Sequence, residues 1–262
     1  MRPINPLVTE TWQGLLLSGE AQVTYLGYLA AQALALIAWW PWGEIHRLLD
    51  TRAEPKTLVA VVIALGVTVS LYAIRAGGQE ILLPGQRSLM EWVAATSLTV
   101  ARILAGYLGA HLLQTLHLLM LSSPLLMAGF AVAGGTWASF AWCIAAVLVM
   151  ATCYRLVGAI IFLLVEQDSP LIFVALRGVL IGSYAIAPFV CPAASQPMLS
   201  YYLLSEDAST HLALAGLQGH WVFVGVYGAL SGLLAVVLYR LLSRKRRGLD
   251  GSHERRVAKE SN

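Results

Sequence analysis

Charge is the property that this sequence has least of. Charged residues make up 12% of its 262 residues, whereas apolar side chains make up 58% and the mean hydropathy is +0.71. Soluble domains carry roughly a quarter of charged residues, so most of this chain is expected to contact lipid or other helices instead of water. This composition excludes an ordinary water-soluble domain and favours an all-α membrane protein.

Signatures of catalysis are also missing. The sequence contains no G-x-x-x-x-G-K-[ST] phosphate loop, no H-E-x-x-H motif and no G-x-S-x-G motif. Its apolar runs hold no paired carboxylates that would relay protons. Cys143, Cys153 and Cys191 have no metal-ligand spacing, and the first two lie in an apolar run, where cysteine behaves as a small hydrophobe. The chain is therefore predicted not to be an enzyme, with no catalytic residues, no metal and no cofactor of its own.

Long apolar runs are what the sequence does contain. The last of them, 221–242, is long enough to span a bilayer and is followed after Ser243 by four basic residues, 244–247. Basic residues beside a membrane helix mark its cytoplasmic end. We predict six transmembrane helices, at about 25–40, 57–74, 103–126, 137–165, 171–189 and 221–242.

The distribution of charge orients these helices. Six crossings with a cytoplasmic C-terminus place both termini inside. The segment 74–102 is then also cytoplasmic, and the positive charges of Arg75, Arg87 and Arg102 agree with that side. The chain is thus expected in the bacterial inner membrane as a multi-pass protein. It divides into an amphipathic cytoplasmic lead-in, a six-helix membrane domain and a basic, disordered tail, at 1–22, 23–243 and 244–262. Beside a membrane helix, a basic tail indicates topology and contact with anionic lipids instead of nucleic acid.

Two connections are more than simple loops. The cytoplasmic segment 77–100 carries Trp92 and other apolar residues beside charged ones over 87–99, which predicts a short helix lying across the base of the membrane. The external segment 191–219 contains a moderately apolar stretch at 198–204 that is too short to span. We expect it to form a short re-entrant or surface helix.

The third predicted span holds an unusual polar set, formed by His111, Gln114 and His117. At 100° per residue these side chains spread over about 120° of one helix face. Three interpretations remain open: hydrogen bonds between helices, a polar lining of a transport path, and contact with haem or a metal. Two histidines six positions apart do not ligate one ion from a straight helix.

Single arginines and small residues mark further positions of interest. Arg177 in the fifth span is expected to reach the cytoplasmic face, to pair with Glu166 or Asp168, or to contact an anionic head group, and Arg155 in the fourth span poses the same question. Pro124 is expected to kink or loosen the end of the third span. Close helix packing is expected at small residues of the third and sixth spans, namely Gly106, Gly109, Gly228, Ser231 and Gly232.

The arrangement resembles the type-2 permeases of ATP-binding cassette exporters over about residues 20–243. The segment 91–99 is similar to that family's acidic, apolar, Thr-Pro-(Leu/Val)-Ser segment before the third helix, although Ser97 stands where proline is usual and Tyr107 where lysine is common. The segment 156–170 is similar to the ending of the fourth helix in that family.

The resemblance implies a permease that forms a translocation path as a dimer, with a second copy or a homologous permease. A separate ATPase subunit would carry ATP and magnesium and drive export. Membrane lipids and accessory periplasmic or membrane proteins are further expected partners, and nucleic acid is not.

In such a permease the helix within 87–99 would be a coupling helix that contacts the ATPase. Arg87 and Glu91 are then expected to pair with charges of the ATPase, Trp92 to insert into a groove on it, and Thr96 to belong to the same contact. The alternative is that this helix lies among the lipid head groups with its charges in water. The alternative function is a haem- or metal-handling membrane enzyme or assembly factor that uses the His111/His117 face.

Overall fold

The computed structural model describes residues 5–17, 19–42, 56–80, 86–133, 136–165, 170–190, 192–204 and 219–260. Within these ranges the chain contains helices and no strand, which confirms the all-α prediction. The elements are α1 (Pro6–Leu17), α2 (Gly19–Ala38), α3 (Lys56–Gly77), α4 (Leu89–Ala95), α5 (Val100–Ala133), α6 (Trp137–Val165), α7 (Pro170–Val190), the 3-10 helix η2 (Pro192–Ala194), α8 (Gln196–Leu204) and α9 (Gly219–Glu260).

Four of these helices are long and apolar enough to cross a membrane. They are α3, α5, α6 and the Gly219–Leu249 part of α9. The first and fifth predicted spans fall on shorter apolar stretches, Gln22–Ala38 in α2 and Val174–Val190 in α7. The fold is therefore that of a helical membrane protein with four candidate spanning helices.

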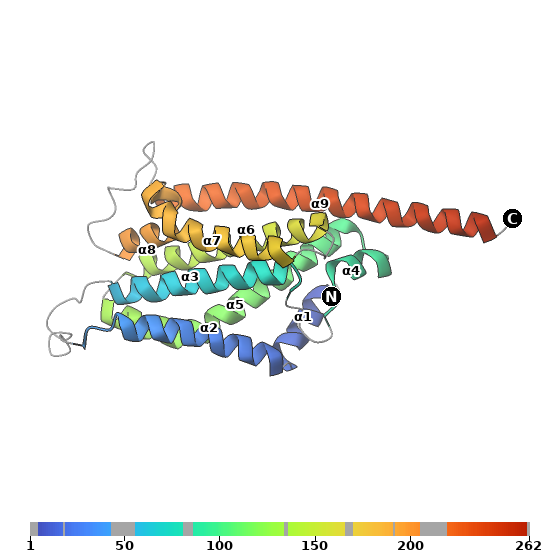
Figure 1. The fold of residues 1–262 in the computed structure, drawn as a ribbon. Helices are drawn as coiled ribbons and strands as arrows, with labels where there is room; N and C mark the ends of the chain where they lie inside the picture. Colours follow the sequence, from blue (N-terminus) through green and yellow to red (C-terminus); the bar gives the residue numbers. More distant parts are fainter. Residues whose placement is uncertain are drawn as a thin grey trace.

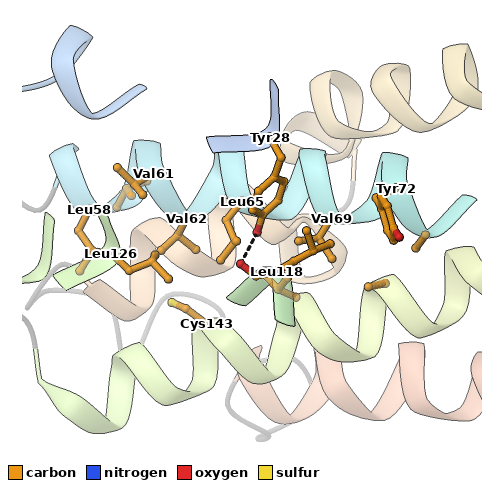
Figure 2. Packing of buried hydrophobic residues seen from close by; sticks show 14 of the residues in the cluster. Tyr28, Leu58, Val61, Val62, Leu65, Val69, Tyr72, Leu118, Leu126 and Cys143 are labelled. Atoms are coloured by element: carbon orange, nitrogen blue, oxygen red, sulfur yellow. Dashed lines mark hydrogen bonds between the residues drawn. The ribbon is translucent and has the colours of Figure 1, made fainter. Parts of the chain in front are cut away.

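Helix α3 lies at the centre of the bundle, with α2, α5, α6, α7 and α8 packed around it (Figure 1). Of its 22 residues, 14 are buried, so it presents apolar side chains to neighbours in nearly all directions. Figure 2 shows Leu65 and Val69 of α3 facing Leu118 of α5, whose backbone oxygen accepts a 3.2 Å hydrogen bond from the hydroxyl of Tyr28 on α2. The core thus joins α2, α3 and α5, and it extends to α6 through Cys143.

Helix α5 passes through Pro124 without ending. Proline removes the N–H that would bond the carbonyl of Met120, and Ser123 Oγ donates to that oxygen at 2.7 Å instead. The helix continues to Ala133. The helix is therefore not interrupted at Pro124, because a neighbouring hydroxyl satisfies the freed carbonyl, and a kink at this position stays a prediction.

Three other bounds differ from those expected. Helix α4 covers Leu89–Ala95 instead of 87–99, because Thr96 is extended (φ −124°, ψ 148°). Helix α8 begins at Gln196 instead of 198. Helix α9 continues to Glu260, past the end expected for the sixth span at 242. The residues after Ser243 include many strong helix formers and no proline.

Helix α8 is packed inside the bundle against α3 and α6. The Nε2 atom of Gln196 donates to the carbonyl of Val62 at 3.3 Å, and a Cβ atom on Gly66 would lie 2.9 Å from Gln196 Oε1. Gly66 is in the middle of α3, ten residues after its start. The start of α8 therefore lies beside the middle of α3.

Close approach between helices occurs at glycines of α3 and α6. A Cβ atom on Gly77 would lie under 3.0 Å from the backbone oxygen of Arg155, and one on Gly158 would lie 2.6 Å from the oxygen of Ile74. By contrast, a Cβ atom on Gly228 or Gly232 would have no neighbour within 4 Å. Within this chain, the expected close packing at these two glycines of the sixth span is therefore wrong.

The two small residues predicted in the third span do make close contacts, and both contacts are with the N-terminal segment. Cβ atoms on Gly106 and Gly109 would lie 2.6 Å and 3.2 Å from the side chains of Asn5 and Val8. Asn5 Nδ2 also donates to the backbone oxygen of Arg102 at 2.8 Å. The lead-in helix α1 is thus packed against the start of α5.

Candidate functional site

A buried arginine lies where α5 meets α6. Arg155 of α6 is 2% exposed; its Nε donates to the hydroxyl of Tyr107 at 2.9 Å and its Nη1 to Oε1 of Gln114 at 3.1 Å. Its Cζ atom lies 4.9 Å from the centre of the Tyr107 ring, a cation–π distance. Both partners belong to α5 and are neutral, so α5 solvates the charge that α6 carries.

No carboxylate of the described ion pairs neutralises this charge. The three pairs in the described ranges join Arg75 and Arg177 to Glu80 and Arg87 to Glu10. No acidic residue occurs between 92 and 165. The next acid in the sequence, Glu166, lies outside the described residues.

His111 belongs to the same group of side chains. It is 2% exposed, its Nε2 lies 3.2 Å from Thr152 Oγ1 on α6, and its Nδ1 lies 3.4 Å from Thr115 Oγ1. We call Tyr107, His111, Gln114, Thr152 and Arg155 the Arg155 cluster. Two members of the predicted polar set, His111 and Gln114, therefore both contact α6, His111 through Thr152 and Gln114 through Arg155.

His117 lies apart from this cluster. Its ring packs edge-on against Tyr25 of α2, with the ring centres 5.2 Å apart. Among the residues that the structure describes, no group of three or more His, Cys, Asp or Glu side chains is arranged to hold a metal ion. His111 and His117 thus contact different helices, α6 and α2 respectively.

Arg177 forms an ion pair with Glu80, the residue that follows the end of α3 by three positions. Arg75 Nε lies 3.7 Å from the same carboxylate. Glu166 and Asp168, which the sequence suggested as partners, lie outside the described residues. Among the described residues, these two arginines therefore share one acid at this end of α3 and α7.

The helix predicted to couple to an ATPase is preformed and capped. Ser88 Oγ accepts from the N–H of Glu91 at 3.1 Å, and Oε2 of Glu91 accepts from the N–H of Ser88 at 3.2 Å. This reciprocal pair is a capping box, which satisfies two donors that a short helix would otherwise leave without partners. Glu91 therefore stabilises the start of α4, and its side chain remains exposed.

Trp92 does not lie on the surface of this chain. It is 3% exposed and packs in one apolar cluster with Leu7 of α1 and with Leu238 and Leu242 of α9. A direct role in filling a groove on a partner is therefore not available to it in this structure. The reason is the phase of the short helix, which turns Trp92 inward and leaves Glu91, Ala94 and Ala95 exposed.

Two flanking helices hold α4 in place. Glu10 of α1 forms a 3.5 Å ion pair with Arg87 and also accepts from its backbone N–H. Arg246 of α9 donates to the carbonyls of Leu98 and Thr96, the latter at 3.3 Å. Sequence reasoning assigned Arg246 to the basic tail alone. No signal in the sequence pairs it with α4, because about 150 residues separate the two.

Replacing Arg246 by glutamine is expected to loosen the corner between α4 and α5. A hydrogen bond from a charged donor contributes about 1.5–3 kcal/mol, so local opening should become at least about tenfold more frequent. Hydrogen–deuterium exchange of the 89–99 backbone should rise accordingly. Arg244→Gln, at an exposed position of the same helix, should leave that exchange unchanged; equal exchange in both variants would contradict the assignment.

Comparison with known proteins found no relative of this chain. No model of a protein family matches this chain, and neither does any curated protein or solved structure.

Proposed function

We propose that this chain is the membrane-spanning permease subunit of an ATP-binding cassette exporter. The observation that carries the proposal is the corner formed by α4 and α5. Helix α4 is capped, is held by α1 and α9, and is joined to the 34-residue helix α5 by the four residues 96–99. A force applied to the exposed face of α4 is therefore transmitted to a helix that runs the length of the bundle.

The proposal requires six crossings, which α2, α3, α5, α6, α7 with α8, and α9 would provide. If Arg177 marks the level at which α3 ends, the thirteen residues of α7 after it extend about 20 Å at 1.5 Å per residue. The hydrocarbon core is about 30 Å thick. Helix α8 would supply the remaining length, so α7 and α8 act together as one broken span.

The proposed assembly contains two permease chains, identical or homologous, and a separate ATPase subunit that binds ATP and magnesium. Both termini would be cytoplasmic in an inner membrane, with membrane lipids and accessory proteins as further partners. The polar residues predicted to line the path lie in two places. His111 and Gln114 would line it as part of the Arg155 cluster, and His117 would line it beside α2.

The coupling face offers a direct test. Ala94 and Ala95 are exposed on α4, so Ala94→Glu and Ala95→Glu should leave the fold intact and repel or block a bound subunit. Purification of the tagged wild-type chain from native membranes in mild detergent should recover an ATP-hydrolysing subunit. We expect each variant to lower the recovered ATPase activity by about tenfold, which corresponds to roughly 1.4 kcal/mol of binding.

Ala138→Glu provides the matched control, since Ala138 is an exposed alanine in the first turn of α6. It should recover the ATPase as the wild type does. A wild-type chain that purifies without any nucleotide-hydrolysing subunit would sink the permease proposal. Equal recovery of the ATPase in the Ala94→Glu and Ala138→Glu variants would support an ATPase partner but show that α4 does not contact it.

A further inference from the structure

The positive charge of Arg155 has no counter-ion among the described side chains. Burying an ion in a protein costs several kcal/mol even after relaxation, and neutral hydrogen-bond partners recover only part of that cost. Ionisable residues inside membrane helices are for this reason usually functional. Tyr107 and Gln114 use two of the five N–H donors of the guanidinium, so further donors exist for a ligand.

We propose that Arg155 binds the anionic group of an amphipathic substrate, a phosphate or carboxylate carried on an apolar tail. The inference rests on the proposed function, since it names the class of molecule that the permease exports. A guanidinium presents a planar fork of donors that matches both of these groups in a bidentate manner. The anion would supply the counter-charge that the chain lacks.

The surroundings of Arg155 favour an amphipathic molecule over a free hydrated anion. The chain contains no Asp, Glu, Lys or Arg between 103 and 154, which covers α5 from its fourth residue and α6 up to Arg155. A substrate that reaches the Arg155 cluster along α5 and α6 therefore meets no other charged side chain in this stretch of the two helices, and most of their residues there are apolar. Transfer of a fully hydrated ion along such a surface is unfavourable, whereas an apolar tail is stabilised there.

At Arg155, α5 and α6 are joined by hydrogen-bonding groups that could bind a ligand instead of each other. Hydrogen bonds from Arg155 to Tyr107 and Gln114, and between His111 and Thr152, join the two helices. The site is closed in this structure, because Arg155 is 2% exposed. A force on α4 that moves α5 would separate these groups and uncover the guanidinium of Arg155. The same step that opens the path would then expose the charge.

Among the described residues, two more arginines lie where α3 ends. Arg75 and Arg177 hold one carboxylate between them, that of Glu80. The backbone of Arg155 lies against Gly77, two residues after Arg75. An anionic head group at this end of the bundle is therefore attracted first to the Arg75/Arg177 pair and is then close to the helix turn that carries Arg155.

The test measures ligand stabilisation of the full-length chain in an uncharged maltoside detergent. The probes are dioctanoyl phosphatidic acid, dioctanoyl phosphatidylcholine and inorganic phosphate, and the readout is the unfolding temperature. Phosphatidic acid should raise the unfolding temperature of the wild type and of Arg240→Gln, an exposed arginine outside the cluster. Arg155→Met should lower the apparent affinity at least about tenfold, and Arg155→Lys should give an intermediate value.

Each outcome decides the proposal. An equal rise for Arg155→Met and wild type would overturn it, as would an equal rise with phosphatidylcholine or with phosphate alone. Arg155→Lys keeps the charge and serves as the informative variant if Arg155→Met does not fold. The ATPase plays no part in this measurement. If the response depends on Arg155 but no ATPase subunit copurifies, the anion site is supported and the permease proposal is rejected. If an ATPase subunit copurifies but the response does not depend on Arg155, the permease proposal is supported and the anion site is rejected.

Discussion

The Gly158→Leu chain is expected to be recovered with a small fraction of the wild-type yield of folded, monodisperse protein. A Cβ atom at Gly158 would lie 2.6 Å from the backbone oxygen of Ile74 and 3.0 Å from the backbone nitrogen of Gly78. Overpacking of a core costs about 1–3 kcal/mol when side chains can shift, and more when backbone must move. Here α3 would have to move away from α6, and the core in Figure 2 is built around α3.

Size-exclusion chromatography of the solubilised protein and its unfolding temperature would measure this effect. Gly178→Leu is the matched control, because a Cβ atom at Gly178 of α7 would have no neighbour within 4 Å. Both changes replace a helical glycine by leucine, so their helix propensities change equally. A wild-type yield for Gly158→Leu would show that α3 and α6 do not approach as closely as described.

Changes in the Arg155 cluster are expected to differ in size according to which partner is removed. Gln114→Leu leaves the buried charge of Arg155 without one of its acceptors, which should lower the free energy of unfolding by about 2 kcal/mol. Arg155→Met removes the charge together with its desolvation cost but leaves the buried amide of Gln114 without its donor, so its effect should be smaller than that of Gln114→Leu. The double variant removes both partners and should be at least as stable as Arg155→Met.

Thermal unfolding of the four chains without added ligand provides the complete double-mutant cycle. A coupling energy near zero would show that Gln114 does not stabilise the guanidinium. Tyr107→Phe offers a parallel measurement at the second acceptor, since it removes the hydroxyl bound by Nε and keeps the ring under Cζ. Its effect should be smaller than that of Gln114→Leu, because the cation–π contact remains.

Much of the helix pattern could be predicted from local properties of the sequence. The bounds 137–165 expected for the fourth span coincide with those of α6, because Gly134 and Gly135 precede a long run in which Arg155 is the only charge and which ends before the polar residues 166–169. Helices α3 and α7 were expected within three residues of their observed ends. Hydropathy and helix breakers act over a few neighbouring residues, so they are visible without the fold.

The candidate site was visible only in part. His111 and Gln114 stood out as polar residues in an apolar run, and Arg155 as a lone charge, but their partnership depends on how α5 and α6 are rotated about their axes. The inward position of Trp92 has the same origin. A seven-residue helix carries too few apolar residues for its periodicity to define a buried face.

The sequence by itself therefore determined an all-helical membrane protein, the positions of its long apolar helices and the types of polar residue that they carry. The tertiary structure decided which of those residues meet: Arg155 with Tyr107 and Gln114, and Arg246 with the end of α4. The physical reason is that hydropathy depends on composition along one helix, whereas contact between helices depends on their close approach and rotation. That approach is set by backbone contacts such as those at Gly77 and Gly158.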